Sequence, residues 1–209
     1  MKTCEASIHA IILAAGTSRR MGKPKQLLPF GDNSLLETVI RLVNKWDFSE
    51  VLTVIGREAE IIQKEIIVND PSFRWIINSS FTNGQSDSLK KAMEQIERTP
   101  LNAMIFLGDL PLLKEETIQK VLNAGKEKLV QTSKPFVVRP KMKGKVGHPV
   151  FFGNAESEWF QQLHGDQGAK PIIKKMNDCT EVEVSDEGIL FDIDTPEDYL
   201  EAKKWSENR

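Results

Sequence analysis

Short apolar runs alternate along this chain with segments of helical spacing. The first and fourth runs are apolar at almost every position, as strands covered on both faces of a sheet are. The expected strands are Ile8–Leu13, Val51–Ile55, Trp75–Ile77, Ala103–Leu107, Phe136–Val138, Pro149–Phe152 and Thr180–Val184. Such a regular alternation of strands and helices predicts an α/β sandwich with a mostly parallel sheet.

Helix signals fill the intervals between these strands. Ser34-Leu35-Leu36-Glu37 is a capping box that predicts a helix to about Lys45. Thr195-Pro196-Glu197-Asp198 supplies a cap, a proline at the first helical position and acidic residues in the first turn. The other expected helices are Glu58–Ile67, Ser86–Glu97 and Lys114–Ala124, the last ending at Gly125 as a C′ residue. Lys141–Phe152 interrupts the alternation and is expected to form a hairpin-like excursion.

Length and composition narrow the class of protein. A chain of 209 residues favours one domain, residues 1–209, with a substantial core. The net charge of −2 gives no basic field for nucleic acid. Cys4 and Cys179 fit neither a metal spacing nor a disulfide framework, which favours a reducing cytoplasm. No apolar stretch approaches the roughly 20 residues that cross a membrane.

The loop after the first strand has the composition of a polyphosphate-binding loop. Gly16 allows backbone N–H groups to approach an anion closely, because it has no Cβ. Arg19, Arg20, Lys23 and Lys25 follow, and both residue types bind phosphate oxygens. The loop is neither a Walker A sequence nor a dinucleotide-binding Gly-x-Gly-x-x-Gly.

The string Leu-Ala-Ala-Gly-x-Ser-x-Arg-Met-Gly at 13–22, followed by Pro-Lys-Gln-Leu-Leu at 24–28, resembles the nucleotidyltransferase superfamily. Within it, the chain resembles the molybdenum cofactor cytidylyltransferases. The resemblance covers nearly the whole chain, because later motifs recur in the expected order. It implies a Rossmann-like nucleotidyltransferase fold, a single-domain three-layer α/β/α sandwich.

Two acidic residues are the candidate ligands of a Mg²⁺ cofactor. Asp109 follows an apolar strand within Gly-Asp-x-Pro, at a strand tip where a hard cation can bind carboxylate, phosphate and water. The alternative is an ordinary turn residue before Pro111. The resemblance assigns a second metal ligand to Asp194 in Asp-x-Asp-Thr-Pro-Glu-Asp, with Asp192 as the alternative. This string also serves simply as a helix start.

The resemblance places a nucleoside triphosphate along two loops. Arg20 and Lys25 are expected to bind the triphosphate and, with Asp109, to carry catalysis. Asn78, Gly84 and Ser88 match a segment that closes around the base and ribose, although Asn83-Gly84 is also a turn signal. The remaining expected nucleotide contacts come from Leu13, Ala14, Ala15 and Gly16.

Two further strings resemble segments that border the second substrate. Gly147-His148-Pro149-Val150 presents His148, and Gly165-Asp166-Gln167-Gly168-Ala169-Lys170 presents Asp166 and Gly168 before a helix. A lone histidine is more often structural, and Asp166 can equally belong to a helix cap. Gly168 at a helix start favours an anion.

These motifs together predict nucleotidyl transfer, with an acceptor phosphate attacking the α-phosphate of a nucleoside triphosphate and pyrophosphate leaving. Ala15, where the guanylyltransferase branch carries glycine, favours CTP, and the two substrate strings favour molybdopterin as the acceptor. The alternatives are a cytidylyltransferase for a sugar or polyol phosphate, a GTP-using molybdopterin guanylyltransferase, and a non-catalytic cofactor carrier for a molybdenum hydroxylase.

Overall fold

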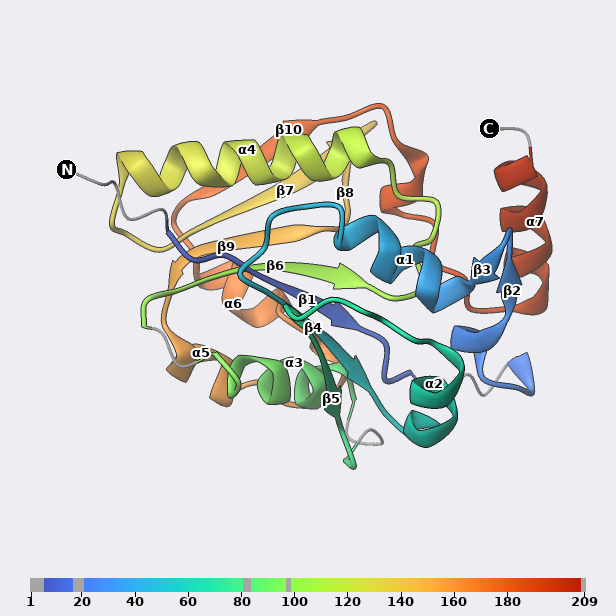
Figure 1. The fold of residues 1–209 in the computed structure, drawn as a ribbon. Coiled ribbons are helices and arrows are strands. Elements are labelled where there is room, and N and C mark those ends of the chain that lie inside the picture. Colours follow the sequence, from blue (N-terminus) through green and yellow to red (C-terminus); the bar gives the residue numbers. More distant parts are fainter. Residues whose placement is uncertain (1–5, 17–20, 81–83, 97–98, 208–209) are drawn as a thin grey trace.

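The computed structural model describes residues 6–16, 21–80, 84–96 and 99–207, and a central twisted sheet dominates it (Figure 1). The strand order is β10-β7-β9-β6-β1-β4-β5, and the short β8 pairs with β7. The strands are β1 (His9–Leu13), β4 (Glu50–Ile55), β5 (Phe73–Ile77), β6 (Leu101–Leu107), β7 (Phe136–Met142), β8 (Lys145–Val146), β9 (Val150–Ala155) and β10 (Cys179–Glu183). All neighbours are parallel except at β9 and β8, which confirms the mostly parallel sheet.

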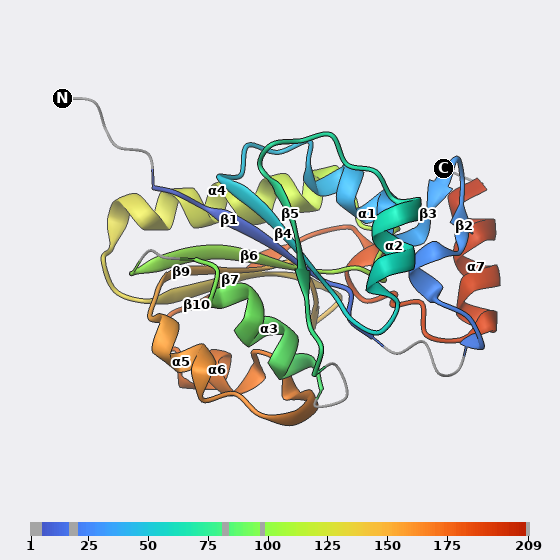
Figure 2. The ribbon, with the colours of Figure 1, turned by 60° about the horizontal axis from the view of Figure 1, so that its bottom comes forward.

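Helices cover both faces of the sheet. In Figures 1 and 2, one face carries α1 (Leu35–Val43), α2 (Ala59–Glu65) and α4 (Glu115–Gln131), and the other carries α3 (Gln85–Met93), α5 (Ser157–Gln161) and α6 (Lys170–Lys175). The C-terminal helix α7 (Pro196–Glu207) lies beside the small hairpin of β2 (Pro29–Phe30) and β3 (Asn33–Ser34). In the described part of the chain, no helix is long and apolar enough to cross a membrane.

The side chains of β1 show how the layers are built. Ala10 and Ile12 belong to the core shared with α1, α2 and α4, whereas Ile11 and Leu13 belong to the core shared with α3, α5 and α6. Successive side chains of a strand point to opposite faces, so an apolar residue at every position buries both faces. The three-layer α/β/α sandwich expected from the sequence is therefore confirmed.

A third apolar cluster lies outside the two sheet cores and joins α7 to the rest of the protein. Its buried members are Phe30, Leu35, Leu112, Ile193 and Ala202. Leu112 follows β6 and Ile193 precedes α7, so this cluster fixes two loops whose acidic residues the sequence singled out.

Most local predictions are confirmed. The capping box is present, because Ser34 and Glu37 each accept a hydrogen bond from the other's backbone N–H. Thr195 and Asp198 form the equivalent pair at the start of α7. The segment from Lys141 to Phe152 contains the β7–β8 hairpin and then enters β9.

The expected helix end at Gly125 is wrong. Helix α4 continues through Gly125 to Gln131, and Gly125 is buried against β9. A Cβ at this position would stand 2.7–2.8 Å from the ring of Phe151. The glycine therefore permits a close helix-to-sheet contact, a tertiary reason that a local helix-ending rule cannot detect.

We predict that Gly125→Ala destabilises the protein by about 1–3 kcal/mol, the usual cost of overpacking a core. The clash with Phe151 should outweigh the gain of about 1 kcal/mol that alanine brings to a helix interior. Chemical denaturation measures the free energy of unfolding, and Gly125→Ala combined with Phe151→Leu should recover part of the loss. A stabilised single variant would contradict this interpretation.

Candidate active site

The loops that follow β1 and β6 meet at the carboxyl end of the sheet. The N–H of Gly108, just after β6, donates to the carbonyl of Leu13 at the end of β1 (2.9 Å). A Cβ at Gly108 would stand 2.8 Å from the Cβ of Ala14. Glycine at 108 therefore lets the two loops approach, and it places Asp109 beside the segment Ala14–Gly16.

Lys25 lies at the centre of the candidate site. It belongs to a short 3₁₀ turn (Lys25–Leu27), and its side chain is only 10% exposed. The ammonium stands 2.8 Å from Asp109 Oδ2, 2.9 Å from Asp194 Oδ1 and 2.9 Å from the carbonyl oxygen of Ile193. The backbone N–H of Ile193 also donates to the carbonyl of Asp109 (3.1 Å). Three predicted site residues, widely separated in sequence, thus converge on one point.

The electrostatics of this cluster keep Lys25 charged. Burial disfavours the ammonium, but the charge and hydrogen bond of Asp109, followed by those of Asp194, outweigh it and raise the pKa of Lys25 above its usual range. The pKa of Asp192 is raised, first by burial and then by the charges of Asp109 and Asp194. All three acidic residues therefore contribute negative potential to one region.

The acidic residues fit a divalent cation that is shared with a substrate. Within the described residues, no group of three or more His, Cys, Asp and Glu side chains is arranged to hold a metal ion. Asp109 and Asp194 nevertheless already share a single cation, the Lys25 ammonium. Asp109 Oδ1 is also buried with no hydrogen-bond partner among the described residues. Mg²⁺ commonly binds one or two carboxylates together with substrate phosphates, and Asp109 and Asp194 provide the two carboxylates.

His148 approaches the same region from the start of β9. Its Nδ1 lies 3.4 Å from the carbonyl oxygen of Ile105 on β6. Burial lowers the pKa of His148, although the carbonyl contact and the charge of Asp109 oppose this effect and Lys170 reinforces it. The imidazole is therefore neutral at pH 7. Because a carbonyl only accepts, the Nδ1–H tautomer suits this contact and leaves Nε2 as an acceptor.

Asn78 and Ser88 form an internal pair rather than an open polar surface. The Asn78 amide donates to the Ser88 hydroxyl (3.0 Å), and its oxygen accepts from the backbone N–H of Ser80 (3.0 Å). Both side chains are buried. They connect the end of β5 to α3 and shape the loop between them, and their contact with a nucleotide stays a prediction.

Gly84, Asp166 and Gly168 meet at the N-terminus of α3. Gly84 has a φ of 100°, and a Cβ there would stand 2.4 Å from Asp166 Oδ1. That same oxygen accepts from the N–H of Gln85 (3.3 Å), so Asp166 caps α3 from a distant part of the chain. The structure thus joins one predicted nucleotide segment to one predicted acceptor segment. Ser86, the first residue of the expected helix Ser86–Glu97, is fully buried within α3.

Gln26 is a residue of the site that the sequence reasoning did not single out. It is 5% exposed, and its amide donates to the carbonyls of Ala14 (2.8 Å) and Gly16 (3.1 Å). The N–H of Ala14 donates to Val54 on β4, which extends the β1–β4 pairing beyond the strand. Gln26 therefore holds the carbonyls of the loop inwards. Its position directly after Lys25 was the available signal. The predicted phosphate ligand Arg20 lies outside the described residues.

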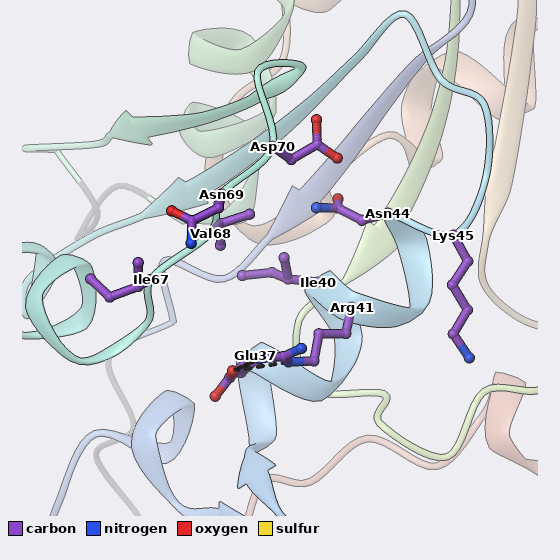
Figure 3. Close-up of a pocket in the computed structure, with 9 residues that line it drawn as sticks. All are labelled: Glu37, Ile40, Arg41, Asn44, Lys45, Ile67, Val68, Asn69 and Asp70. Carbon is purple, nitrogen blue, oxygen red and sulfur yellow. Dashed lines mark hydrogen bonds and ion pairs between the residues drawn. The ribbon is translucent and has the colours of Figure 1, made fainter.

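A separate pocket of about 520 Å³ lies away from this cluster (Figure 3). It opens between α1 with the two residues that follow it and the segment 67–70, which leads into the amino end of β5. Arg41 in its wall pairs with Glu37, and Lys45 pairs with Glu115 outside the wall. Its basic residues are thus already paired with acidic ones, and the predicted site residues are not among those that line it.

The sequence pattern of the MobA-like NTP transferase domain matches residues 10–180. The chain belongs to this family. The match includes Lys25, Asp109 and His148, whereas Asp194 lies beyond its end.

Some relatives of this MobA-like NTP transferase match nearly its whole length. Molybdenum cofactor cytidylyltransferase of Escherichia coli (strain K12) is 26% identical over 201 residues, 95% of this chain and 97% of the relative. Purine catabolism protein PucB of Bacillus subtilis (strain 168) is 26% identical over 197 residues, 90% and 92% of the two chains. The crystal structure of Rv0371c from Mycobacterium tuberculosis H37Rv gives a TM-score of 0.80 at 23% identity, covering 95% and 98%. A crystal structure of the same mycobacterial protein with manganese has a TM-score of 0.76 and 22% sequence identity. It covers 95% of this chain and 99% of its own.

For this MobA-like NTP transferase we predict that Gln26→Glu weakens nucleoside triphosphate binding by about tenfold or more, since an unmet buried hydrogen bond costs roughly 1–3 kcal/mol. A carboxylate at this position loses both donors and faces two carbonyl oxygens. Binding is measured by calorimetry, with the exposed Gln161→Glu as the control for added charge. Equal affinities in the two variants would show that the hydrogen bonds from Gln26 to the loop carbonyls do not shape the loop.

Proposed function

We propose that this protein is a Mg²⁺-dependent nucleotidyltransferase that transfers CMP from CTP to the phosphate of molybdopterin and releases pyrophosphate. The observation that carries the proposal is the convergence of Asp109 and Asp194 on one cationic centre, beside the loop that follows β1. Carboxylates for a metal ion and a loop for phosphates are then adjacent, as in-line transfer to an α-phosphate requires.

In this reaction an oxygen of the acceptor phosphate forms a new bond to the α-phosphorus, and the bond to the β-phosphate oxygen breaks. The acceptor phosphate is already ionised, so a strong general base is not needed, and positioning with charge neutralisation provides the catalysis. Bound by Asp109 and Asp194, Mg²⁺ would supply positive charge to the reacting phosphates. Lys25 and Arg20 bind the triphosphate and stabilise the charge that develops on pyrophosphate.

The acceptor would lie on the side of the site formed by β9 and the turn before α6. The neutral His148 can accept a hydrogen bond from an N–H group of a pterin through Nε2. Asp166 lies next to Gly84 and Gly168 lies next to Gln85, so this side adjoins the segment proposed for the base and ribose.

The E. coli relative is named a molybdenum cofactor cytidylyltransferase, and a mycobacterial structure was determined with manganese. Both support the proposed substrates and metal ion. A molybdenum hydroxylase is the proposed recipient of the product.

We predict that Asp109→Asn lowers kcat by at least about 10²-fold, the usual loss when a preorganised charged group in a transition state is removed. The fold should persist, because the amide keeps the size and one oxygen of the carboxylate. Pyrophosphate release is measured with saturating Mg²⁺, CTP and molybdopterin. Asp47→Asn, an exposed carboxylate before β4, is the matched control and should stay active. A fully active Asp109→Asn would remove the metal assignment.

We predict a preference for CTP over GTP of at least about tenfold in kcat/KM, because a misfit in a pocket is worth roughly 1–3 kcal/mol. Ala15 places a methyl group where the guanylyl branch has none. Turnover with CTP, GTP and ATP on the same acceptor measures the preference. A GTP preference would favour the guanylyl reaction, and no turnover with any nucleotide would favour the non-catalytic carrier.

A further inference from the structure

Among the described residues, three acceptors lie within hydrogen-bond distance of the Lys25 ammonium. They are Asp109 Oδ2 at 2.8 Å, Asp194 Oδ1 at 2.9 Å and the Ile193 carbonyl at 2.9 Å. An ammonium has three N–H donors and no more. Lys25 therefore cannot donate to a triphosphate while it keeps all three contacts, and binding a phosphate oxygen requires that it release at least one of them.

The carboxylate oxygens held by Lys25 are the ones that a metal ion needs. The Asp109 side chain is 22% exposed, but its Oδ1 is fully buried, so Oδ1 contributes nothing to that exposure. Asp194 is 36% exposed and uses Oδ1 to bind Lys25. Because Oδ1 is buried, the Asp109 oxygen left to meet a hydrated cation is Oδ2, which Lys25 already holds. The ammonium and the metal ion thus compete for the same position.

The charges around Lys25 and its long side chain would allow it to exchange the carboxylates for phosphate oxygens. Lys25 balances part of the negative potential of Asp109, Asp194 and the nearby Asp192. A divalent cation in its place would balance more, and a triphosphate would provide the displaced ammonium with new oxygens. The flexible four-carbon stem of lysine lets the charge move while the backbone of the 3₁₀ turn stays in place.

We propose that the Lys25 ammonium occupies the metal position of the free protein, and that a divalent cation enters only when a triphosphate draws Lys25 away from Asp109 and Asp194. The proposal rests on the proposed function, because it takes a nucleoside triphosphate as the ligand that receives Lys25. It assigns the metal–triphosphate complex, rather than the free metal ion, as the species that binds productively.

Mn²⁺ binding to the protein without nucleotide tests the exchange. Loss of the free-ion electron paramagnetic resonance signal measures the affinity of the wild type, Lys25→Met and Lys64→Met. Lys25→Met should bind Mn²⁺ at least about tenfold more tightly, since two carboxylates without their ammonium attract a dication more strongly. Lys64→Met removes the same charge from an exposed position on α2 and should match the wild type. Adding Asp109→Asn to Lys25→Met should abolish the gain.

A second measurement uses the wild type alone and stays decisive if Lys25→Met fails to fold. Paramagnetic broadening of the backbone amides of Gly108 and Ile193 is followed while Mn²⁺ or preformed Mn²⁺–tripolyphosphate is added. The complex should broaden these amides at a concentration at least about tenfold lower than Mn²⁺ alone, since it provides oxygens for Lys25.

Two results would overturn the exchange: Mn²⁺ affinity in Lys25→Met equal to or weaker than in the wild type, or equal broadening by free and complexed Mn²⁺. Neither measurement depends on turnover. A protein that fails to transfer CMP but gains Mn²⁺ affinity in Lys25→Met would refute the proposed function and keep the exchange. An active transferase in which Lys25→Met gains no Mn²⁺ affinity would support the proposed function and refute the exchange.

Discussion

The buried ammonium of Lys25 is the contact on which the candidate site depends. It joins a turn near the start of the chain to the loop after β6, 84 residues away, and to the loop before α7, 169 residues away. Burying a charge is costly unless it is paired, and this one has two carboxylates and a carbonyl around it. The third apolar cluster supports the same loops from behind through Leu112 and Ile193. Packing and electrostatics therefore bring together segments that no sheet pairing connects.

The layered fold could be predicted from the sequence because its causes are local. Apolar runs such as those at β1 and β6 identify buried strands, and Ser34 and Thr195 mark helix starts through hydrogen bonds within four residues. The continuation of α4 through Gly125 could not be predicted in this way. It depends on the ring of Phe151, which packs on that glycine from a strand 26 positions later.

In the site too, some features could be predicted from local sequence and others depend on tertiary contacts. Asp109, Asp194 and Lys25 were identifiable one by one from their motifs, and the motifs of Asp109 and Lys25 each follow an expected strand. That Lys25 bridges both carboxylates depends on side-chain positions that spacing does not encode. The capping of α3 by Asp166 and the hydrogen bonds from Gln26 to the loop carbonyls are also tertiary contacts. They could not be predicted, because aspartate and glutamine suit many roles.

The antiparallel strand β9 has a consequence for how such a site can vary. In a fully parallel sheet, only the loops that follow strands reach the carboxyl edge. Because β9 runs the opposite way between β6 and β7, the residues that precede it, His148 among them, arrive at that edge from the other direction. The β7–β9 excursion thus reaches the same edge as the loops after β1 and β6 without being part of them. Changes in its length and composition can alter the residues at that edge while the loops after β1 and β6 stay as they are.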